Sequence, residues 1–410
     1  MESIQIRNIG PIINASVELN RLTVIIGPQS SGKSTIAKIV TFCQWLEKYA
    51  IVHQDTVAID YAFVKETLID YFKLGSYLNN GYYIEFNGDA IKFVFAAPDV
   101  VEVSMTENFH KMAVGKIAYI PAERNLVSFP NLPSMKMEYD YVREYIFDWL
   151  SIHNKYTKDN AIKLPNLDLK YYYDSNMGDV IELGEGKPIL LNEASSGVIS
   201  IVPLYVYVHY LTKWVYDHQG DASFASQKEI RRSIFKELKK QVRSDIFEKL
   251  DIEHEEEFAK AFLEMLPVLE STQNQEITKS EKLKEIIDLK ERLSAPHYSR
   301  IIMEEPEINL DPNTQFGLVN DLLSIVNLER DKVLLTTHSP YILNHLNLLF
   351  KVYDTKNKDF VGLNYDDVNV FTTLDGRIIN LKIKNAHLIN PEYLSAPLDK
   401  IYDQYEKLEK

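Results

Sequence analysis

The feature that most constrains the fold is a short glycine-rich segment near the start of the chain. Residues 27–34 read Gly-Pro-Gln-Ser-Ser-Gly-Lys-Ser and match the phosphate-binding pattern G-x-x-x-x-G-K-[ST]. The segment follows a continuous apolar run, Leu22–Ile26, and a helical spacing of apolar residues extends from Lys33 to about Tyr49. A buried strand, a glycine turn and a helix in this order predict an α/β fold and a loop whose backbone N–H groups surround a phosphate.

The residue types in this loop fit the contacts that a nucleotide phosphate needs. We expect Lys33 to neutralise the β- and γ-phosphates and Ser34 to offer its hydroxyl to Mg²⁺. The other residues expected to contribute to the phosphate site are Gly27, Pro28, Gln29, Ser30, Ser31, Gly32 and Thr35.

A second motif places carboxylates at the end of an apolar strand. Residues 301–303 read Ile-Ile-Met, and Glu304, Glu305, Pro306 and Glu307 follow. If this strand lies beside the phosphate loop in one sheet, the first carboxylate can hold a metal through water and the second can polarise an attacking water. An acidic strand end alone is often only a solvated turn. The catalytic interpretation is favoured here because the chain also carries the phosphate loop.

The third motif is a histidine after another apolar strand. Residues 334–340 read Leu-Leu-Thr-Thr-His-Ser-Pro, and His338 follows Glu305 by 33 positions. A lone histidine in a strand is more often structural. Its spacing from Glu305 favours a residue that faces the γ-phosphate.

Together the three motifs resemble an ABC-type ATPase head. Residues 304–311, Glu-Glu-Pro-Glu-Ile-Asn-Leu-Asp, look like the Walker B motif with its D-loop, and residues 192–198, Asn-Glu-Ala-Ser-Ser-Gly-Val, look like an ABC signature. The Glu-Glu-Pro-Glu and Thr-His-Ser-Pro segments, with Tyr-Ile-Pro-Ala-Glu-Arg at 119–124, are similar to the soluble RecF, SMC and OLD branch. The resemblance covers residues 1–130, 188–217 and 299–350.

The resemblance implies ATP and Mg²⁺ as ligands and ATP hydrolysis as the activity. It implies catalytic roles for Lys33, Glu305 and His338, and metal binding by Ser34 and Glu304. Ser195 would contact the γ-phosphate held by a second subunit. The other residues that the resemblance adds to the nucleotide site are Ser196, Gly197 and Asp311.

Three positions depart from the family pattern. Glu304 stands where the Walker B aspartate is usual, and Ser196 and Val198 replace a glycine and a polar residue of the signature. A Q-loop glutamine is not visible, and Glu123 or Arg124 is the candidate to act in its place.

Composition narrows the class of protein. The chain of 410 residues has 45 Lys plus Arg, 59 Asp plus Glu and a net charge of −14, which argues against a surface coated in positive charge. A single cysteine, Cys43, excludes a disulfide framework and a multi-cysteine zinc site, and its position on a helical apolar stripe predicts a core residue. The chain start shows no secretory signal, so we expect a cytoplasmic protein.

The motifs divide the chain into four parts. We expect an N-terminal ATPase lobe with a β-hairpin arm at 1–130, a signature-containing region at 131–217, a helical insertion at 218–298 and a C-terminal ATPase lobe at 299–410. The fold class is therefore α/β, an ABC-type P-loop ATPase head with an antiparallel β-subdomain and an inserted helical region. The apolar stretch at 198–216 contains Pro203 and Lys213, which favours a buried helix over a membrane span.

The insertion begins with a basic amphipathic pattern from Lys228 to Arg243. Two interpretations stay open: a solvated face of a packed helix, or a contact with DNA or a protein. The acidic residues at 251–257 would reduce the positive electrostatic field of this basic segment.

The function implied by the resemblance is an ATP-driven switch. Two heads would associate around ATP as a homodimer or higher homo-oligomer and signal to a separate effector, such as a nuclease or toxin, in DNA surveillance or bacteriophage defence. One alternative is the nucleotide-binding subunit of a membrane transporter, and another is an ATP-holding scaffold or inhibitor with negligible turnover.

Overall fold

The computed structural model describes residues 2–129, 136–184, 187–218, 232–234, 281–357 and 361–408. Most of the predicted insertion, including the basic pattern except for residues 232–234, and the acidic run at 251–257 lie outside these residues. The strands are β1 (Ser3–Ile9), β2 (Ile12–Glu18), β3 (Leu22–Ile26), β4 (Leu78–Asn87), β5 (Ile91–Ala96), β6 (Val100–Met105), β7 (Lys116–Ile120), β8 (Ile162–Leu164), β9 (Leu169–Asp174), β10 (Gly178–Leu183), β11 (Ile189–Leu190), β12 (Ser299–Glu304), β13 (Lys332–Thr337), β14 (Val368–Leu374), β15 (Arg377–Asn380), β16 (Lys382–Ile383) and β17 (Leu388–Ile389).

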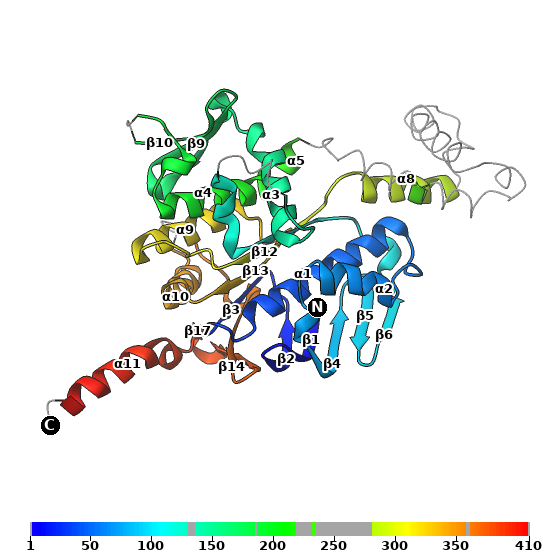
Figure 1. Ribbon diagram of the computed structural model, residues 1–410, viewed down its shortest axis with the longest axis horizontal. Coiled ribbons are helices and arrows are strands. Elements are labelled where there is room, and N and C mark those ends of the chain that lie inside the picture. Colours follow the sequence, from blue (N-terminus) through cyan, green and yellow to red (C-terminus); the bar gives the residue numbers. More distant parts are fainter. Residues whose placement is uncertain are drawn as a thin grey trace, which may run out of the picture.

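The main helices run between and around these strands (Figure 1). They are α1 (Lys33–His53), α2 (Tyr61–Val64), α3 (Tyr141–Ile152), α4 (Ser196–His209), α5 (Val215–Asp217), α8 (Glu281–Ser294), α9 (Pro312–Ile325), α10 (Pro340–Asp354) and α11 (Pro391–Leu408). The C-terminal helix α11 extends away from the body of the molecule (Figure 1).

One large sheet organises the molecule. Its strand order is β6-β5-β4-β1-β2-β15-β14-β3-β13-β12-β7. The five strands from β14 to β7 are parallel, and β1, β2, β4, β5 and β6 pair antiparallel. A separate antiparallel sheet has the order β11-β10-β9-β8. The predicted α/β class and antiparallel part are therefore confirmed.

The parallel strands are buried on both faces, which explains why they appear in the sequence as continuous apolar runs. Val24, Met303 and Leu335 point into a core shared with α3, α4, α9 and α10. Their neighbours Ile25, Ile302 and Leu334 point to the opposite face, where α1 packs. Cys43 lies in this second core with 0% exposure, as predicted.

The apolar stretch at 198–216 belongs to a continuous helix, Ser196–Asp217, formed by α4, a π-helical turn and α5. By length and composition alone this helix is able to cross a membrane, but 67% of its most apolar window is buried inside the protein. The structure therefore agrees with the predicted buried helix.

A buried carboxyl group joins α1 to the β4–β5 hairpin. The Glu47 Oε1 atom accepts hydrogen bonds from the backbone N–H groups of Ala90 at 2.6 Å and Ile91 at 3.3 Å. Burial, reinforced by the nearby Glu2 and Asp89 carboxylates, raises the pKa of Glu47 to about 7, although the two N–H donors act in the opposite direction.

This raised pKa predicts a pH-dependent stability. The contribution of Glu47 is fully present below its ordinary pKa of 4.5 and is lost as the pH rises through about 7. Glu47→Gln keeps the acceptor oxygen without the charge. We therefore expect the free energy of unfolding of the variant, relative to that of the wild type, to increase by up to about 3 kcal/mol as the pH rises from 5 to 8. Urea unfolding of both proteins across this range measures the difference, and parallel pH profiles would contradict the prediction.

Candidate functional site

The three predicted motifs meet because their strands are neighbours. In the sheet β13 lies between β3 and β12, and all three are parallel (Figure 1). The register pairs Thr337 with Ile26 and Thr336 with Glu304. Since the carboxyl ends of parallel strands share one edge, the phosphate loop, the carboxylates and His338 lie at the same edge of the sheet.

The loop after β3 has the geometry of an anion-binding turn. Gly32 caps α1 with φ of +97°, and a Cβ atom there would lie 2.7 Å from Ile12 Cγ1, so only glycine fits. Ser30 also adopts a left-handed conformation, with φ of +59°. Residues 28–30 are exposed, whereas Thr35 is buried. The Ser31 hydroxyl contacts Thr373 Oγ1 at 2.5 Å, which joins the loop to β14.

The Lys33 ammonium group is held inside this loop. It donates to the carbonyl oxygens of Gly27 at 3.0 Å and Pro28 at 2.8 Å. Burial lowers the pKa of Lys33, while the negative field of Glu305, followed by Glu307 and Glu304, acts in the opposite direction. The lysine is thus an electrostatic partner of the carboxylates that follow β12.

Glu304 is the last residue of β12 and is 5% exposed. Burial raises the pKa of Glu304, and the nearby hydroxyls of Ser34 and Tyr119 oppose this shift. Its Oε1 atom has no hydrogen-bond partner among the described residues. A buried, unpartnered carboxylate oxygen near the Ser34 hydroxyl fits a hard cation that takes its remaining ligands from phosphate and water. In the described part of the chain, three or more His, Cys, Asp or Glu side chains do not cluster as a metal site of their own.

Glu305 and His338 face one another across the strand ends. The Glu305 Oε1 atom lies 3.2 Å from His338 Nε2, and the two side chains are 31% and 29% exposed. The backbone of Glu305 is left-handed, with φ of +42°, and its N–H group donates to the Thr336 carbonyl at 2.8 Å. The site therefore presents a carboxylate and an imidazole that are both reachable from solvent.

Two further polar residues hold the His338 segment, and neither was among the predicted site residues. The Glu307 Oε1 atom accepts from Thr337 Oγ1 and from the His338 N–H, both at 2.7 Å. Gln315 on α9 accepts from Ser339 Oγ at 2.5 Å and donates to the Leu310 carbonyl at 2.9 Å. Glu307 is a third acid in an already acidic motif, but no local pattern marks Gln315.

The signature-like residues lie at the exposed start of α4. Ser195 caps the helix, its hydroxyl accepting from the Val198 N–H at 3.5 Å, and Ser196 is also exposed. Across the described ranges, no hydrogen bond joins Ser195 to the phosphate loop of its own chain. A helix N-terminus presents unpaired N–H groups, so this end of α4 has the chemistry of an anion site.

Asp311, the predicted end of the D-loop, caps α9. It accepts from the Thr314 hydroxyl and from the N–H groups of Asn313 at 2.9 Å and Thr314 at 3.3 Å. These hydrogen bonds, chiefly the one from the Thr314 hydroxyl, lower the pKa of Asp311.

The residues proposed to replace the Q-loop glutamine have different surroundings. Glu123 is exposed, but Arg124 is 0% exposed and donates to the backbone carbonyls of Glu304 and Glu305. The Arg124 guanidinium is turned into the protein interior, whereas Glu123 is presented to solvent. That either residue takes the place of the Q-loop glutamine stays a prediction.

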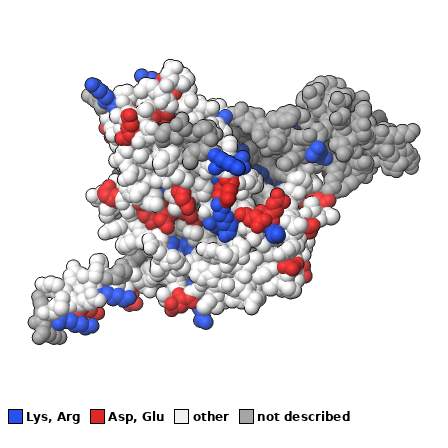
Figure 2. All heavy atoms as spheres, in the orientation of Figure 1, with Lys and Arg blue, Asp and Glu red and all other residues white. Residues whose placement is uncertain are grey.

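On the face that Figure 2 shows, surface charge does not single out a nucleic-acid site. Figure 2 shows acidic and basic side chains next to each other across the middle of one face. The basic pattern from Lys228 to Arg243 lies almost wholly outside the described residues.

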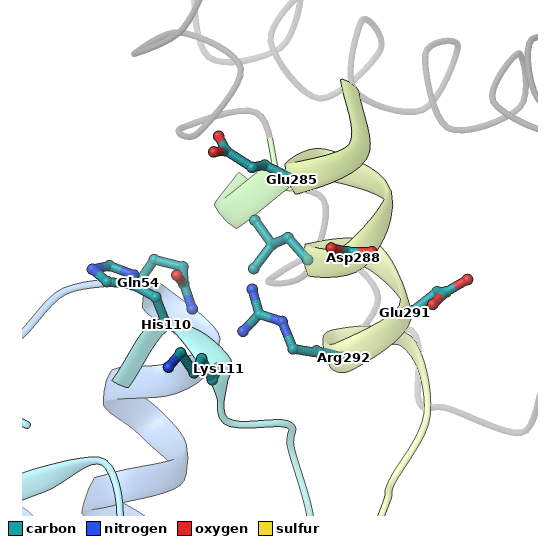
Figure 3. Close-up of a pocket in the computed structure, with 8 residues that line it drawn as sticks. Gln54, His110, Lys111, Glu285, Asp288, Glu291 and Arg292 are labelled. Atoms are coloured by element: carbon teal, nitrogen blue, oxygen red, sulfur yellow. The ribbon is translucent and has the colours of Figure 1, made fainter. Parts of the chain in front are cut away.

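A pocket of about 660 Å³ lies elsewhere, between the end of α1, residues 109–111 and α8. Figure 3 shows Arg292 reaching from α8 towards the side of His110 and Lys111. Its lining carries both charge signs and contains none of the motif residues: Gln54, His110, Lys111, Glu285, Asp288, Leu289, Glu291 and Arg292. This lining gives no preference for an anion or a cation.

Part of this site lies in a segment that is similar in sequence to a known family. Residues 290–343 match the sequence model of the family described as AAA ATPase domain, and this segment contains β12, α9, β13 and His338. No curated protein sequence matches the chain significantly.

Several solved structures are similar in fold. The SMC head domain from Thermotoga maritima has 10% identity and a TM-score of 0.40, covering 93% of this chain and 98% of that one. The recombination mediator protein RecF has 13% identity and a TM-score of 0.27, covering 92% and 97%. An Smc head domain from Pyrococcus furiosus has 10% identity and a TM-score of 0.29, covering all of both chains. Residues 290–343 are therefore similar to an AAA ATPase domain, and the sheet brings the phosphate loop, the carboxylates and His338 to one edge.

Proposed function

We propose that this protein hydrolyses ATP as a molecular switch whose two heads associate around the nucleotide. The observation that carries the proposal is the meeting of three groups at one sheet edge. These are the Lys33 ammonium in its glycine loop, the Glu305–His338 pair at 3.2 Å, and the buried unpartnered oxygen of Glu304. Each group matches one requirement of phosphoryl transfer to water.

In the bound state the loop would hold the phosphates. Lys33 would exchange its contacts with the Gly27 and Pro28 carbonyls for the β- and γ-phosphate oxygens. Ser34 and Glu304 would hold Mg²⁺, which neutralises charge on the phosphates when it is bound. The start of α1 adds its dipole to the same anion.

Hydrolysis then needs one oriented water. Glu305 is partly exposed beside His338, so its carboxylate is able to accept a hydrogen bond from water and draw it towards the γ-phosphate. His338 is held by its own backbone bond to Glu307, which fixes its place next to Glu305. In this proposal His338 senses whether the γ-phosphate is present.

The second half of the site would come from another copy of the chain. Ser195, Ser196 and Gly197 lie at an exposed helix N-terminus. This end would bind the γ-phosphate held by the partner, with Asp311 and the D-loop at the same interface. The proposed unit is a homodimer or a higher homo-oligomer.

The output of such a switch is a change of shape passed to another protein. By the sequence resemblance we infer a separate effector, such as a nuclease or toxin, in DNA surveillance or bacteriophage defence, with the chain in the cytoplasm and no membrane partner. DNA contact through residues 228–243 is part of this proposal. Stimulation of ATP turnover by linear double-stranded DNA would support it, and unchanged turnover would point to a protein trigger instead.

A mixing experiment tests the composite site. Lys33→Ala removes the phosphate lysine, and Ser195→Arg places a bulky side chain where the partner's phosphate would bind. A mixed dimer keeps one complete site, formed by Lys33 of one chain and Ser195 of the other, and the opposite site holds no nucleotide. Since half of the dimers are mixed and each has one site, we expect turnover to recover to at most about a quarter of the wild-type rate.

The comparison is with each variant alone, measured by phosphate release at the same total protein concentration. A mixture no more active than the sum of the two variants would show that Ser195 does not complete the site of another chain.

A further inference from the structure

Arg124 joins two parts of the site that are far apart in the sequence. Its guanidinium donates to the carbonyls of Glu304 at 2.9 Å, Glu305 at 2.8 Å and Ser200 at 3.0 Å, and also to the nearby Pro121 carbonyl at 3.4 Å. The side chain is completely buried, and in the described ranges it makes no ion pair with an acidic side chain. All four acceptors are backbone atoms, so Arg124 fixes the main chain after β12 relative to the main chain of α4.

A second link runs in parallel. Asn309, in the D-loop, donates through Nδ2 to Ser200 Oγ at 2.9 Å. At Gly197 a Cβ atom would lie 3.1 Å from the Asn309 carbonyl oxygen, so the D-loop rests on the first turn of α4. Ser200 thus receives one bond on its carbonyl from Arg124 and one on its hydroxyl from the D-loop.

Ser200 lies on the same helix as the exposed signature-like residues, so these bonds connect the exposed start of α4 to the protein interior. Ser195 is exposed at the N-terminal cap, and Ser200, five residues later, is 0% exposed. A helix moves as a rigid rod over such a distance, so a shift of its exposed end also moves Ser200. At the other end of the link, Glu305 has a left-handed φ of +42°, a conformation that non-glycine residues hold only when their surroundings impose it.

We propose that Ser200, Arg124 and Asn309 form a junction that couples the two ATP sites of the dimer. This proposal rests on the function proposed above. When the start of α4 engages the γ-phosphate bound by the partner, the junction passes the movement to the backbone of Glu305. Glu305 then takes its water-orienting position more readily when the partner also holds ATP. Arg124 is a positioning residue in this scheme, because it acts through Glu305.

The test compares cooperativity with affinity in two variants of the full chain. Ser200→Ala removes the hydroxyl that receives Asn309 and leaves the backbone in place. Arg124→Lys keeps the charge but has a single ammonium in place of the guanidinium that contacts four carbonyls. The measurements are the ATP dependence of turnover and the affinity for a fluorescent ATP analogue.

For the wild type we expect a Hill coefficient above 1. In each variant we expect it to fall to about 1 and kcat to fall at least about fivefold, with nucleotide affinity unchanged within about twofold. A purely structural defect would not abolish cooperativity while sparing affinity. Ser151→Ala is the matched control, because the hydroxyl of Ser151 is exposed and, among the described residues, bonds only to the Asp148 carbonyl within α3.

If both variants keep the wild-type Hill coefficient, the proposal that the junction couples the two ATP sites is wrong. If Arg124→Lys does not fold, the Ser200→Ala result decides. A wild-type chain without ATP turnover would contradict the proposed function itself, whereas a wild type that hydrolyses ATP with a Hill coefficient of 1 would overturn only the coupling.

Discussion

Replacing Lys33 by alanine is expected to lower ATP turnover by about 10²–10³-fold and to weaken nucleotide binding. The reason is electrostatic. Lys33 is the cation that the glycine loop holds at the sheet edge, and it is surrounded by the carboxylates of Glu305, Glu307 and Glu304. Without it, these carboxylates would face the triphosphate with less compensation from the protein.

The measurement is phosphate release with Mg²⁺, together with the affinity for a fluorescent ATP analogue. Lys65→Ala is a suitable control, since Lys65 is exposed and lies on the short helix after α2, outside the three motifs. Retention of wild-type binding and turnover by Lys33→Ala would show that the loop does not bind the phosphates in the proposed way.

Glu305→Gln is expected to lower kcat by about 10²–10⁴-fold while it leaves ATP binding intact. Glutamine has the same shape, and its amide is able to keep the contact with His338 that the carboxylate makes at 3.2 Å. It cannot supply the negative charge that polarises water. The two variants therefore separate two roles: loss of Lys33 affects binding and rate together, and loss of the Glu305 charge affects the rate alone.

Single-turnover hydrolysis and analogue binding measure this separation. Glu329→Gln removes an exposed carboxylate in the loop before β13 and is the matched control. A Glu305→Gln protein that turns over ATP at the wild-type rate would exclude Glu305 as the residue that orients water.

The parts of the fold that the sequence predicts well are those with strong local signals. Strand β3 and the start of α1 follow from an apolar run and a glycine loop, and the β4–β5 hairpin follows from its Asn-Gly turn. No comparably strong signal marks β6, an edge strand whose residues are mostly exposed, or β8, which has only three residues. Such strands owe their conformation to pairing with a neighbour.

The site divides in the same way. The sequence places the phosphate loop with Lys33, the Glu304–Glu305 pair and His338 after or at the ends of three strands, and the sheet order brings them together. The long-range contacts of Arg124 could not be predicted, because their acceptors are backbone carbonyls 76, 180 and 181 positions away. Any residue type has such a carbonyl, so no side-chain pattern marks the partner.

The central claim is that two heads close around ATP, and Glu305→Gln offers the most direct test of it. With hydrolysis blocked, the ATP-bound dimer should accumulate. We would measure the mass of Glu305→Gln in solution with Mg²⁺ and either ATP or ADP, beside the double variant Glu305→Gln with Ser195→Arg. Our account predicts twice the chain mass with ATP, the single-chain mass with ADP, and no doubling in the double variant. An unchanged mass on addition of ATP, under conditions where the analogue binds, would contradict the dimer.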